Sequence, residues 1–227
     1  MSTLQTTREP ITRDAGRSSL ATYRRAEMAS IFFAGPLLAL FLTPRQAVAV
    51  LIPATLWAII SLWRDRSFAR AEFWNWGAAR AAMPGIVGRF LILSAMVAAV
   101  ILIFAPEMFL SFPRERPRIW ALVMLFYPIF SVYPQELVWR ALFHHRYRHA
   151  LPGKWCLVGA SASAFALMHV VFNNWVALAM TMIGGVLFAQ TYERTRSTAA
   201  VWFEHTLYGC MAFTFGLGVY FYAGAVR

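Results

Sequence analysis

Long apolar runs separated by short polar segments make up most of the chain after its first 27 residues. Several runs approach the roughly 20 residues that an α-helix needs to cross a bilayer. The runs cover approximately residues 28–43, 46–63, 85–105, 118–133, 156–172, 175–192 and 198–222. A further helix around residues 134–147 would add to their number. The pattern predicts an all-α polytopic membrane bundle of about seven to eight transmembrane helices over residues 28–227.

Two polar segments have their own character. Residues 1–27 carry five arginines and contain no apolar run long enough for a signal-peptide core, which predicts a disordered basic cytoplasmic tail. Residues 64–82 mix tryptophan and phenylalanine with arginine, which predicts an amphipathic helix lying in the membrane interface.

Composition supports a membrane protein. Apolar residues make up 59% of the chain and charged residues only 14%, whereas soluble domains average about a quarter charged. The net charge of +11 comes mostly from arginines between the apolar runs, so we ascribe it to membrane orientation and not to nucleic acid. An orientation with the N-terminus in the cytoplasm puts most of these residues inside, and a bacterial inner membrane fits it.

Four ionisable residues fall inside apolar runs, where a charge costs several kcal/mol and marks a functional site. They are Glu136, Arg140, His169 and His205. Pro134 is well placed to begin a helix with Glu136 in its first turn, and Arg140 lies four residues further on the same face, which predicts an ion pair.

Two histidines and a carboxylate on three segments form a recurrent constellation of metal hydrolases and of general-base sites. Asn173 follows His169 by one turn, and Glu204 directly precedes His205. The interpretation without chemistry is that the Glu136 and Arg140 pair braces the bundle and that each histidine is a hydrogen-bonded core residue. No HExxH motif is present, which excludes a helix-borne zincin.

The order of these residues resembles the CAAX-protease and bacteriocin-processing (CPBP, or Abi) family of intramembrane proteases, which includes type II CAAX prenyl endopeptidases. The resemblance covers about residues 118–222. It implies a helical bundle around a water-filled cavity in which a peptide bond near the membrane surface is hydrolysed. Glu136 and Arg140 match the second glutamate and the arginine of the family's Glu-Glu-x-x-x-Arg motif, and His169 and His205 match its two later histidines.

Two positions depart from the family pattern. Gln135 stands where the family has the first glutamate, which is thought to activate water, and Gly209 stands where it usually has Asn or Asp. A glutamine cannot accept a proton from water at neutral pH. Activity then requires that Glu136 or Glu204 supply the missing carboxylate.

The resulting hypothesis is a peptidase in which Glu136 is the general base and His169 and His205 stabilise the oxyanion or, with Glu136, hold a divalent metal such as zinc. Arg140 would orient Glu136, while Gln135 and Asn173 would position substrate or water. The expected partners are membrane lipid and a membrane-associated or prenylated-like peptide, with no nucleic acid.

Three alternatives stay open. An inactive family member would act as a membrane scaffold or immunity protein, with Gln135 and Gly209 as marks of lost chemistry. A haem protein would use His169 and His205 as axial ligands. A transporter would use Glu136 as its proton carrier.

Overall fold

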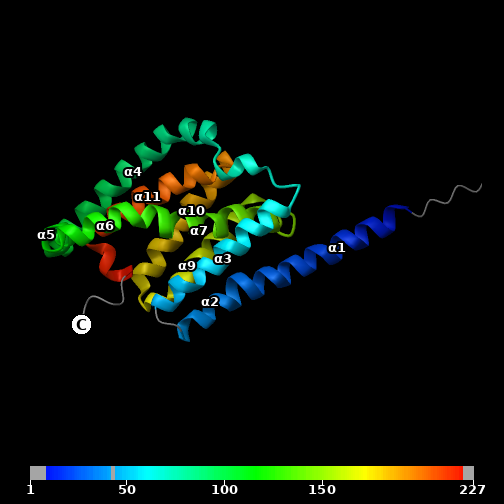
Figure 1. Ribbon diagram of the computed structural model, residues 1–227, viewed down its shortest axis with the longest axis horizontal. Helices are drawn as coiled ribbons and strands as arrows, with labels where there is room; N and C mark the ends of the chain where they lie inside the picture. Colours follow the sequence, from blue (N-terminus) through cyan, green and yellow to red (C-terminus); the bar gives the residue numbers. More distant parts are fainter. Residues whose placement is uncertain (1–8, 42–43, 222–227) are drawn as a thin grey trace, which may run out of the picture.

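Helices make up nearly all of residues 9–41 and 44–221, the part of the chain that the computed structural model describes, and this part contains no β-strand (Figure 1). The prediction of an all-α helical bundle is confirmed. The α-helices are α1 (Glu9–Met28), α2 (Gly35–Leu38), α3 (Pro44–Arg64), α4 (Trp76–Phe104), α5 (Ser111–Glu115), α6 (Pro117–Tyr127), α7 (Tyr133–Glu136), α8 (Phe143–Tyr147), α9 (Lys154–Met168), α10 (Trp175–Thr195) and α11 (Thr198–Thr214).

Wider and tighter helical turns join several of these helices. The π-helical segments are Ala29–Ala34, Pro128–Val132 and Leu137–Leu142. The 3₁₀ segments are Ala39–Phe41, Arg70–Phe73, Pro106–Met108, His169–Phe172 and Leu217–Phe221.

Four helical stretches of the described chain are long and apolar enough to cross a membrane. They are Arg70–Phe104, Pro117–Tyr147, Lys154–Phe172 and Trp175–Thr195, and Ala49–Arg64 is a shorter apolar helix. Their outer faces carry large exposed apolar side chains, as an integral membrane protein requires; on α4 and α6 these are Leu91, Ile92, Met96, Val100, Ile103, Leu122, Leu125 and Phe126.

The number of such stretches is lower than the seven to eight helices predicted. One reason is that the run at 118–133 and the expected extra helix at 134–147 form one continuous helical rod, α6 to α8, through two π-helical segments. As predicted, Pro134 lies in the first turn of a helix, α7, but the preceding π-helical segment runs into α7 without a break. Glu136 gains no stabilisation from a helix N-terminus there.

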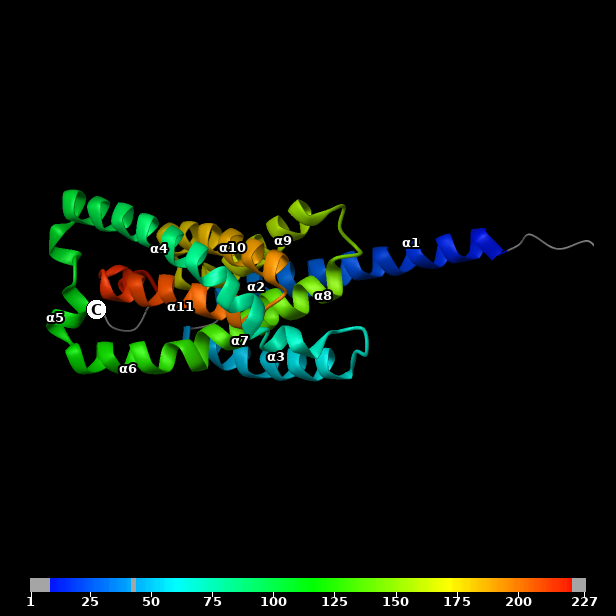
Figure 2. The same cartoon turned by 90° about the horizontal axis from the view of Figure 1, so that it is seen from above.

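The later helices pack closely around α10. In α10, Gly185 allows close approach to α9, because an added Cβ would lie 3.0 Å from the Cα of Ala162. On its other side α10 contacts α11, which also packs along α4 (Figure 2). The packing brings the centre of α11 against α7, and thus His205 against Glu136.

The tryptophan-rich segment 64–82 differs from the amphipathic helix predicted. After α3 ends at Arg64, the Asp65 carboxylate accepts hydrogen bonds from the backbone and hydroxyl of Ser67, which favours a turn. The side chain of Asn75 then caps α4 by accepting from the Ala78 amide. Local side-chain hydrogen bonds thus replace one long helix by a turn, a 3₁₀ segment and the start of α4.

The basic tail predicted to be disordered over residues 1–27 instead contains α1 from Glu9 onward, which projects from the bundle in Figures 1 and 2. Residues 1–8 lie outside the described chain. The last turns of α1 are held by the bundle: Arg25 donates to the Ala150 carbonyl, and Glu27 accepts from Arg146 and Tyr147. These contacts fix the end of the helix at α8.

Glu27 is the centre of this attachment. Burial alone would raise the pKa of Glu27, but hydrogen bonds from Arg146 and Tyr147 outweigh burial and hold the pKa below its ordinary value of 4.5. A carboxyl with a lowered folded-state pKa stabilises the fold above the pKa of the unfolded chain, and this contribution is lost as the pH falls through the lowered value.

Replacing Glu27 with Gln is therefore expected to lower the free energy of unfolding at pH 7 by about 1–3 kcal/mol, because the charge-assisted hydrogen bonds from Arg24, Arg146 and Tyr147 are lost or weakened. Thermal unfolding of the detergent-purified protein, followed by tryptophan fluorescence from pH 3 to pH 8, measures this effect. The difference between variant and wild type should shrink toward acid pH. A difference that does not depend on pH would contradict the ionic origin of the contact.

Candidate functional site

A large cavity lies among α4, α6, α7, α9, α10 and α11, with a volume of about 1410 Å³. Most of its lining is apolar, and the described residues that line it include no Asp or Glu. Its lining from α4, α10 and α11 comes mainly from Leu93–Ile101, Val176–Phe188 and His205–Phe213. These stretches are the parts of the three helices remote from the arginine-rich ends of α1, α8 and α10.

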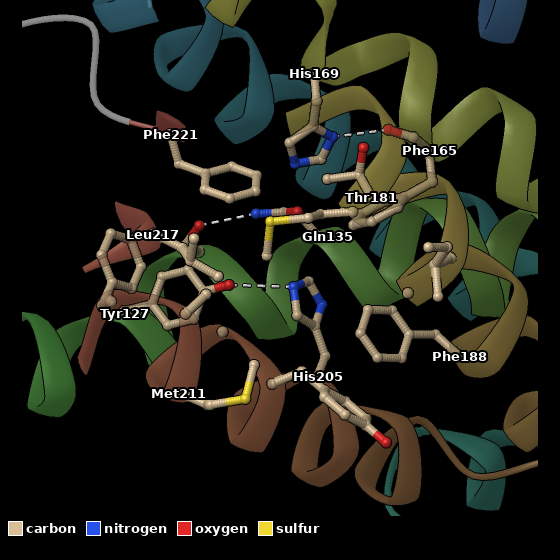
Figure 3. Close-up of a pocket in the computed structure, with 18 of the residues that line it drawn as sticks. Tyr127, Gln135, Phe165, His169, Thr181, Phe188, His205, Met211, Leu217 and Phe221 are labelled. Atoms are coloured by element: carbon tan, nitrogen blue, oxygen red, sulfur yellow. Dashed lines mark hydrogen bonds between the residues drawn. The ribbon is translucent and has the colours of Figure 1, made fainter. Parts of the chain in front are cut away.

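Polar side chains from four helical segments meet at the inner wall of this cavity (Figure 3). Gln135 comes from α7, His169 from the turn after α9, Thr181 from α10 and His205 from α11. Tyr127, at the end of α6, faces His205. The structure therefore brings together both predicted histidines and Gln135.

His205 is held on three sides. Its Nδ1 lies 2.7 Å from Oε1 of Glu136, and its Nε2 lies 3.1 Å from the hydroxyl of Tyr127. Its ring stacks on Phe188 with a centroid separation of 4.5 Å, and Phe165 meets it edge-on. Because Nδ1 faces a carboxylate, Nδ1 carries the proton, and the carboxylate stabilises positive charge on the ring.

Glu136 lies behind His205 and is not part of the cavity wall. Its side chain is fully buried, and so is that of Arg140, whose Nε lies 3.4 Å from Oε2 of Glu136. Arg140 also donates to the hydroxyl of Ser161 at 3.0 Å and lies over the ring of Phe165. The predicted ion pair is thus present, and the other oxygen of Glu136 contacts His205, which lines the cavity.

His169 has a different environment from His205. Its Nδ1 lies 2.8 Å from the carbonyl oxygen of Phe165, one turn earlier in α9. A carbonyl oxygen only accepts, so Nδ1 carries the proton and Nε2 carries a lone pair. Figure 3 shows the opposite edge of this ring turned toward the cavity. His169 therefore presents a proton acceptor to whatever occupies the cavity.

Gln135 occupies the cavity wall between the two histidines (Figure 3). Its amide nitrogen donates to the hydroxyl of Ser131 at 2.8 Å. Its Oε1 is buried and has no hydrogen-bond partner among the described residues. An unpaired buried carbonyl oxygen is costly, so this atom is suited to accept a hydrogen bond from a bound water or amide.

The two remaining predicted site residues lie elsewhere. Asn173 is exposed in the turn before α10, with a left-handed φ of 52°, and is not part of the cavity wall. Glu204 is fully buried, is absent from the cavity lining and pairs with Arg89. Neither side chain therefore contacts the cavity in this arrangement.

The described residues contain no group of three or more His, Cys, Asp and Glu placed to hold a metal ion. Both nitrogens of His205 already face hydrogen-bond partners, Glu136 and Tyr127. The donor set His169, His205 and Glu136 therefore does not fit a metal as the side chains are arranged.

Sequence reasoning missed Tyr127 and Ser131. Both lie on the helix face of Gln135, at intervals of four residues in an otherwise apolar run. A polar stripe at this spacing is a readable signal, because residues four apart share one face of a helix.

Residues 116–211 match the protein family described as type II CAAX prenyl endopeptidase Rce1-like. The match spans a little under half of the chain and contains Glu136, Arg140, His169 and His205. It confirms the family resemblance predicted from those residues, and at family level it supports an intramembrane endopeptidase. No curated protein and no solved structure gives a significant match.

The buried ion pair of Glu136 and Arg140 leads to a prediction about stability. Replacing Arg140 with Met leaves a buried carboxylate without its cation and is expected to cost about 3–5 kcal/mol of folding free energy. Thermal unfolding and the yield of monodisperse protein in detergent measure the loss. The double variant Glu136→Gln/Arg140→Met should recover most of it, because no unpaired charge remains.

Arg66→Met serves as the control, since Arg66 is exposed. A double variant as unstable as Arg140→Met alone would show that the contacts of Arg140 with Ser161 and Phe165 matter more than its charge.

Proposed function

We propose that this protein is an intramembrane endopeptidase in which two histidines of opposite chemical character act on a peptide bond within the cavity. The observation that carries the proposal is their pairing: Nδ1 of His169 donates to a backbone carbonyl, whereas Nδ1 of His205 donates to the carboxylate of Glu136. Two like side chains in environments that differ in this way can take different roles, here His169 as the base and His205 as the group that stabilises developing charge.

His169 is the proton acceptor of this mechanism. Its Nε2 takes a proton from a water molecule as the water oxygen attacks the carbonyl carbon of the substrate. It later returns that proton to the leaving nitrogen as the C–N bond breaks. The unpaired Oε1 of Gln135 supports the step by accepting a hydrogen bond from the second hydrogen of the same water, which stays on the water oxygen.

His205 stabilises the negative charge that develops on the substrate oxygen. Glu136 contributes through His205, because its carboxylate stabilises the protonated ring and fixes its orientation. This role replaces the direct action on water predicted from the sequence, since Glu136 is absent from the cavity wall. Arg140 pairs with Glu136 and holds it in place.

The cavity favours a membrane-associated substrate. Its volume of about 1410 Å³ exceeds the roughly 300–1,000 Å³ of small-molecule pockets, and its lining is mainly apolar. An extended peptide with an apolar or prenyl-like attachment fits such a space better than a polar peptide does. Membrane lipid around the apolar outer faces completes the environment.

The arrangement of charge supports an N-terminus in the cytoplasm of a bacterial inner membrane. Contacts of Glu27 with Arg146, of Asp65 with His145 and of Asn75 with the Thr195 carbonyl gather the ends of α1, α3, α8 and α10 at one end of the bundle. That end is rich in arginine, as cytoplasmic ends are. The cavity then lies toward the opposite face, from which substrate would approach.

The proposal predicts that His169→Asn and Glu136→Gln each lower the rate of peptide cleavage at least about a hundredfold. The measurement uses proteoliposomes with two internally quenched peptides of one sequence, one farnesylated at its C-terminal cysteine and one not. His149→Asn, at an exposed position remote from the cavity, is the control. Full cleavage by Glu136→Gln would refute the proposed mechanism.

Elemental analysis of the same preparations tests the divalent metal. About one equivalent of zinc in the wild type that disappears in His169→Asn and Glu136→Gln would replace the two-histidine mechanism by a metal-assisted one.

A second candidate function is a catalytically inactive member of this fold that acts as a membrane scaffold or immunity protein. The observation that favours it is that Gln135 stands where the family has a glutamate, so that the described cavity wall has no carboxylate. In this case the cavity would hold a peptide or lipid chain without cutting it.

Replacing Gln135 with Glu separates the two candidates. It puts a carboxylate between the histidines, where a second base raises the rate of a working peptidase by no more than about tenfold, because His169 already accepts the proton. An inactive scaffold gains cleavage that the wild type lacks altogether. Wild-type protein that cuts neither peptide, together with an active Gln135→Glu variant, would establish the scaffold function.

A further inference from the structure

We infer that Tyr127 is a catalytic group of the proposed peptidase and that its hydroxyl donates a hydrogen bond to the carbonyl oxygen of the scissile peptide. The inference rests on the proposed function and extends it to a residue outside the predicted site. Its basis is a chain of three groups, Glu136, His205 and Tyr127, that leads from a buried carboxylate to the cavity wall.

The position of Tyr127 is well defined. Its hydroxyl forms a hydrogen bond with Nε2 of His205 at a distance of 3.1 Å. Phe213 of α11 packs edge-on against its ring at a centroid separation of 5.2 Å. Both contacts come from α11, so this helix places the phenol and the imidazole relative to each other.

Gly209 provides the space that Tyr127 fills. An ideal Cβ at Gly209 would lie 2.5 Å from Cε1 and 2.7 Å from Cζ of Tyr127, and closer still to the hydroxyl oxygen. Gly209 lies within α11 and needs no special backbone conformation. The requirement for glycine is therefore the close approach of the phenol. Any side chain at position 209 would push the hydroxyl away from His205.

Three other polar side chains of the wall, Gln135, Thr181 and His169, have their donors engaged elsewhere or present an acceptor. The Gln135 amide donates to Ser131, and the hydroxyl of Thr181 donates to the Ala177 carbonyl of its own helix. Nε2 of His169 carries a lone pair. The hydroxyl of Tyr127 lies at the cavity wall, 3.1 Å from Nε2 of His205, so its hydrogen can turn from the imidazole toward a carbonyl oxygen in the cavity.

The step balances with Tyr127 as a donor that keeps its proton. Water oxygen forms a bond to the carbonyl carbon, the water proton moves to Nε2 of His169, and the carbonyl electron pair becomes an oxyanion. The Tyr127 hydroxyl, polarised by His205 and Glu136, stabilises that oxyanion by a hydrogen bond. His169 returns the proton to the leaving nitrogen, the C–N bond breaks, and all three groups regain their starting states.

The first measurement is independent of cleavage. Diethyl pyrocarbonate labels accessible imidazole nitrogens, and mass spectrometry of the intact-fold protein gives the labelling rate of His205 relative to that of His169. Tyr127→Phe removes the hydroxyl, and Gly209→Ala displaces the phenol, so each should raise this ratio by about tenfold, as loss of one hydrogen bond implies. The double variant should show no further increase.

Tyr133→Phe is the matched control, because its hydroxyl lies toward the Phe73 carbonyl and its residue is not in the cavity wall. It should give the wild-type ratio. Thermal unfolding checks that each variant folds. A folded Tyr127→Phe variant with the wild-type ratio would overturn the inference.

The second measurement is cleavage of the quenched peptides in proteoliposomes. Loss of an oxyanion donor should lower kcat in Tyr127→Phe by about a hundredfold and leave KM nearly unchanged, since the interaction forms in the transition state. An active wild type with an equally active Tyr127→Phe variant would overturn this inference alone. A wild type that cleaves neither peptide would overturn the proposed function, and the catalytic role of Tyr127 with it.

Discussion

The charge of Glu136 within the helical bundle is the constraint on which the site depends. A carboxylate with no exposure to solvent persists as an ion only when cations and hydrogen-bond donors surround it. Arg140 meets one of its oxygens and His205 the other. Because Arg140 comes from the same rod and His205 from α11, neutralising this one charge also fixes the position of α11 against α7 and the orientation of the imidazole that faces the cavity.

That arrangement separates the charge from the cavity. Glu136 and Gln135 are consecutive, so they point to different sides of the helix, and the neutral residue is the one that faces the peptide-sized space. The apolar lining and the absence of a carboxylate in the described wall make the cavity suitable for binding an apolar chain. The polar groups that remain are neutral or paired, and their chemistry depends on the direction in which each hydrogen bond runs.

The sequence predicted the parts of this picture that follow from composition and spacing. Apolar run lengths predicted an all-α membrane bundle, and the interval between Glu136 and Arg140 predicted their pair. Residue spacing did not reveal that the helix continues through Pro134, because a π-helical segment on either side accommodates the proline without ending the rod. It also did not indicate that Asn173 is exposed, since that depends on a left-handed turn after His169.

Tyr127 shows why such a residue is hard to find from spacing alone. Four residues advance slightly more than one turn in an α-helix and slightly less in the wider π-helix, so a helix containing both keeps Tyr127, Ser131 and Gln135 on one face. These polar residues also suggest a different interpretation of Gln135 and Gly209, the two departures from the family pattern. The absence of a side chain at Gly209 leaves the room that the Tyr127 phenol requires, and Gln135 donates a hydrogen bond to Ser131. Different polar groups therefore occupy the places of the family's first glutamate and of its Asn or Asp. Substitution at positions 135 and 209 is therefore, on structural grounds, a rearrangement of the site's donors and not by itself a sign that the chemistry was lost.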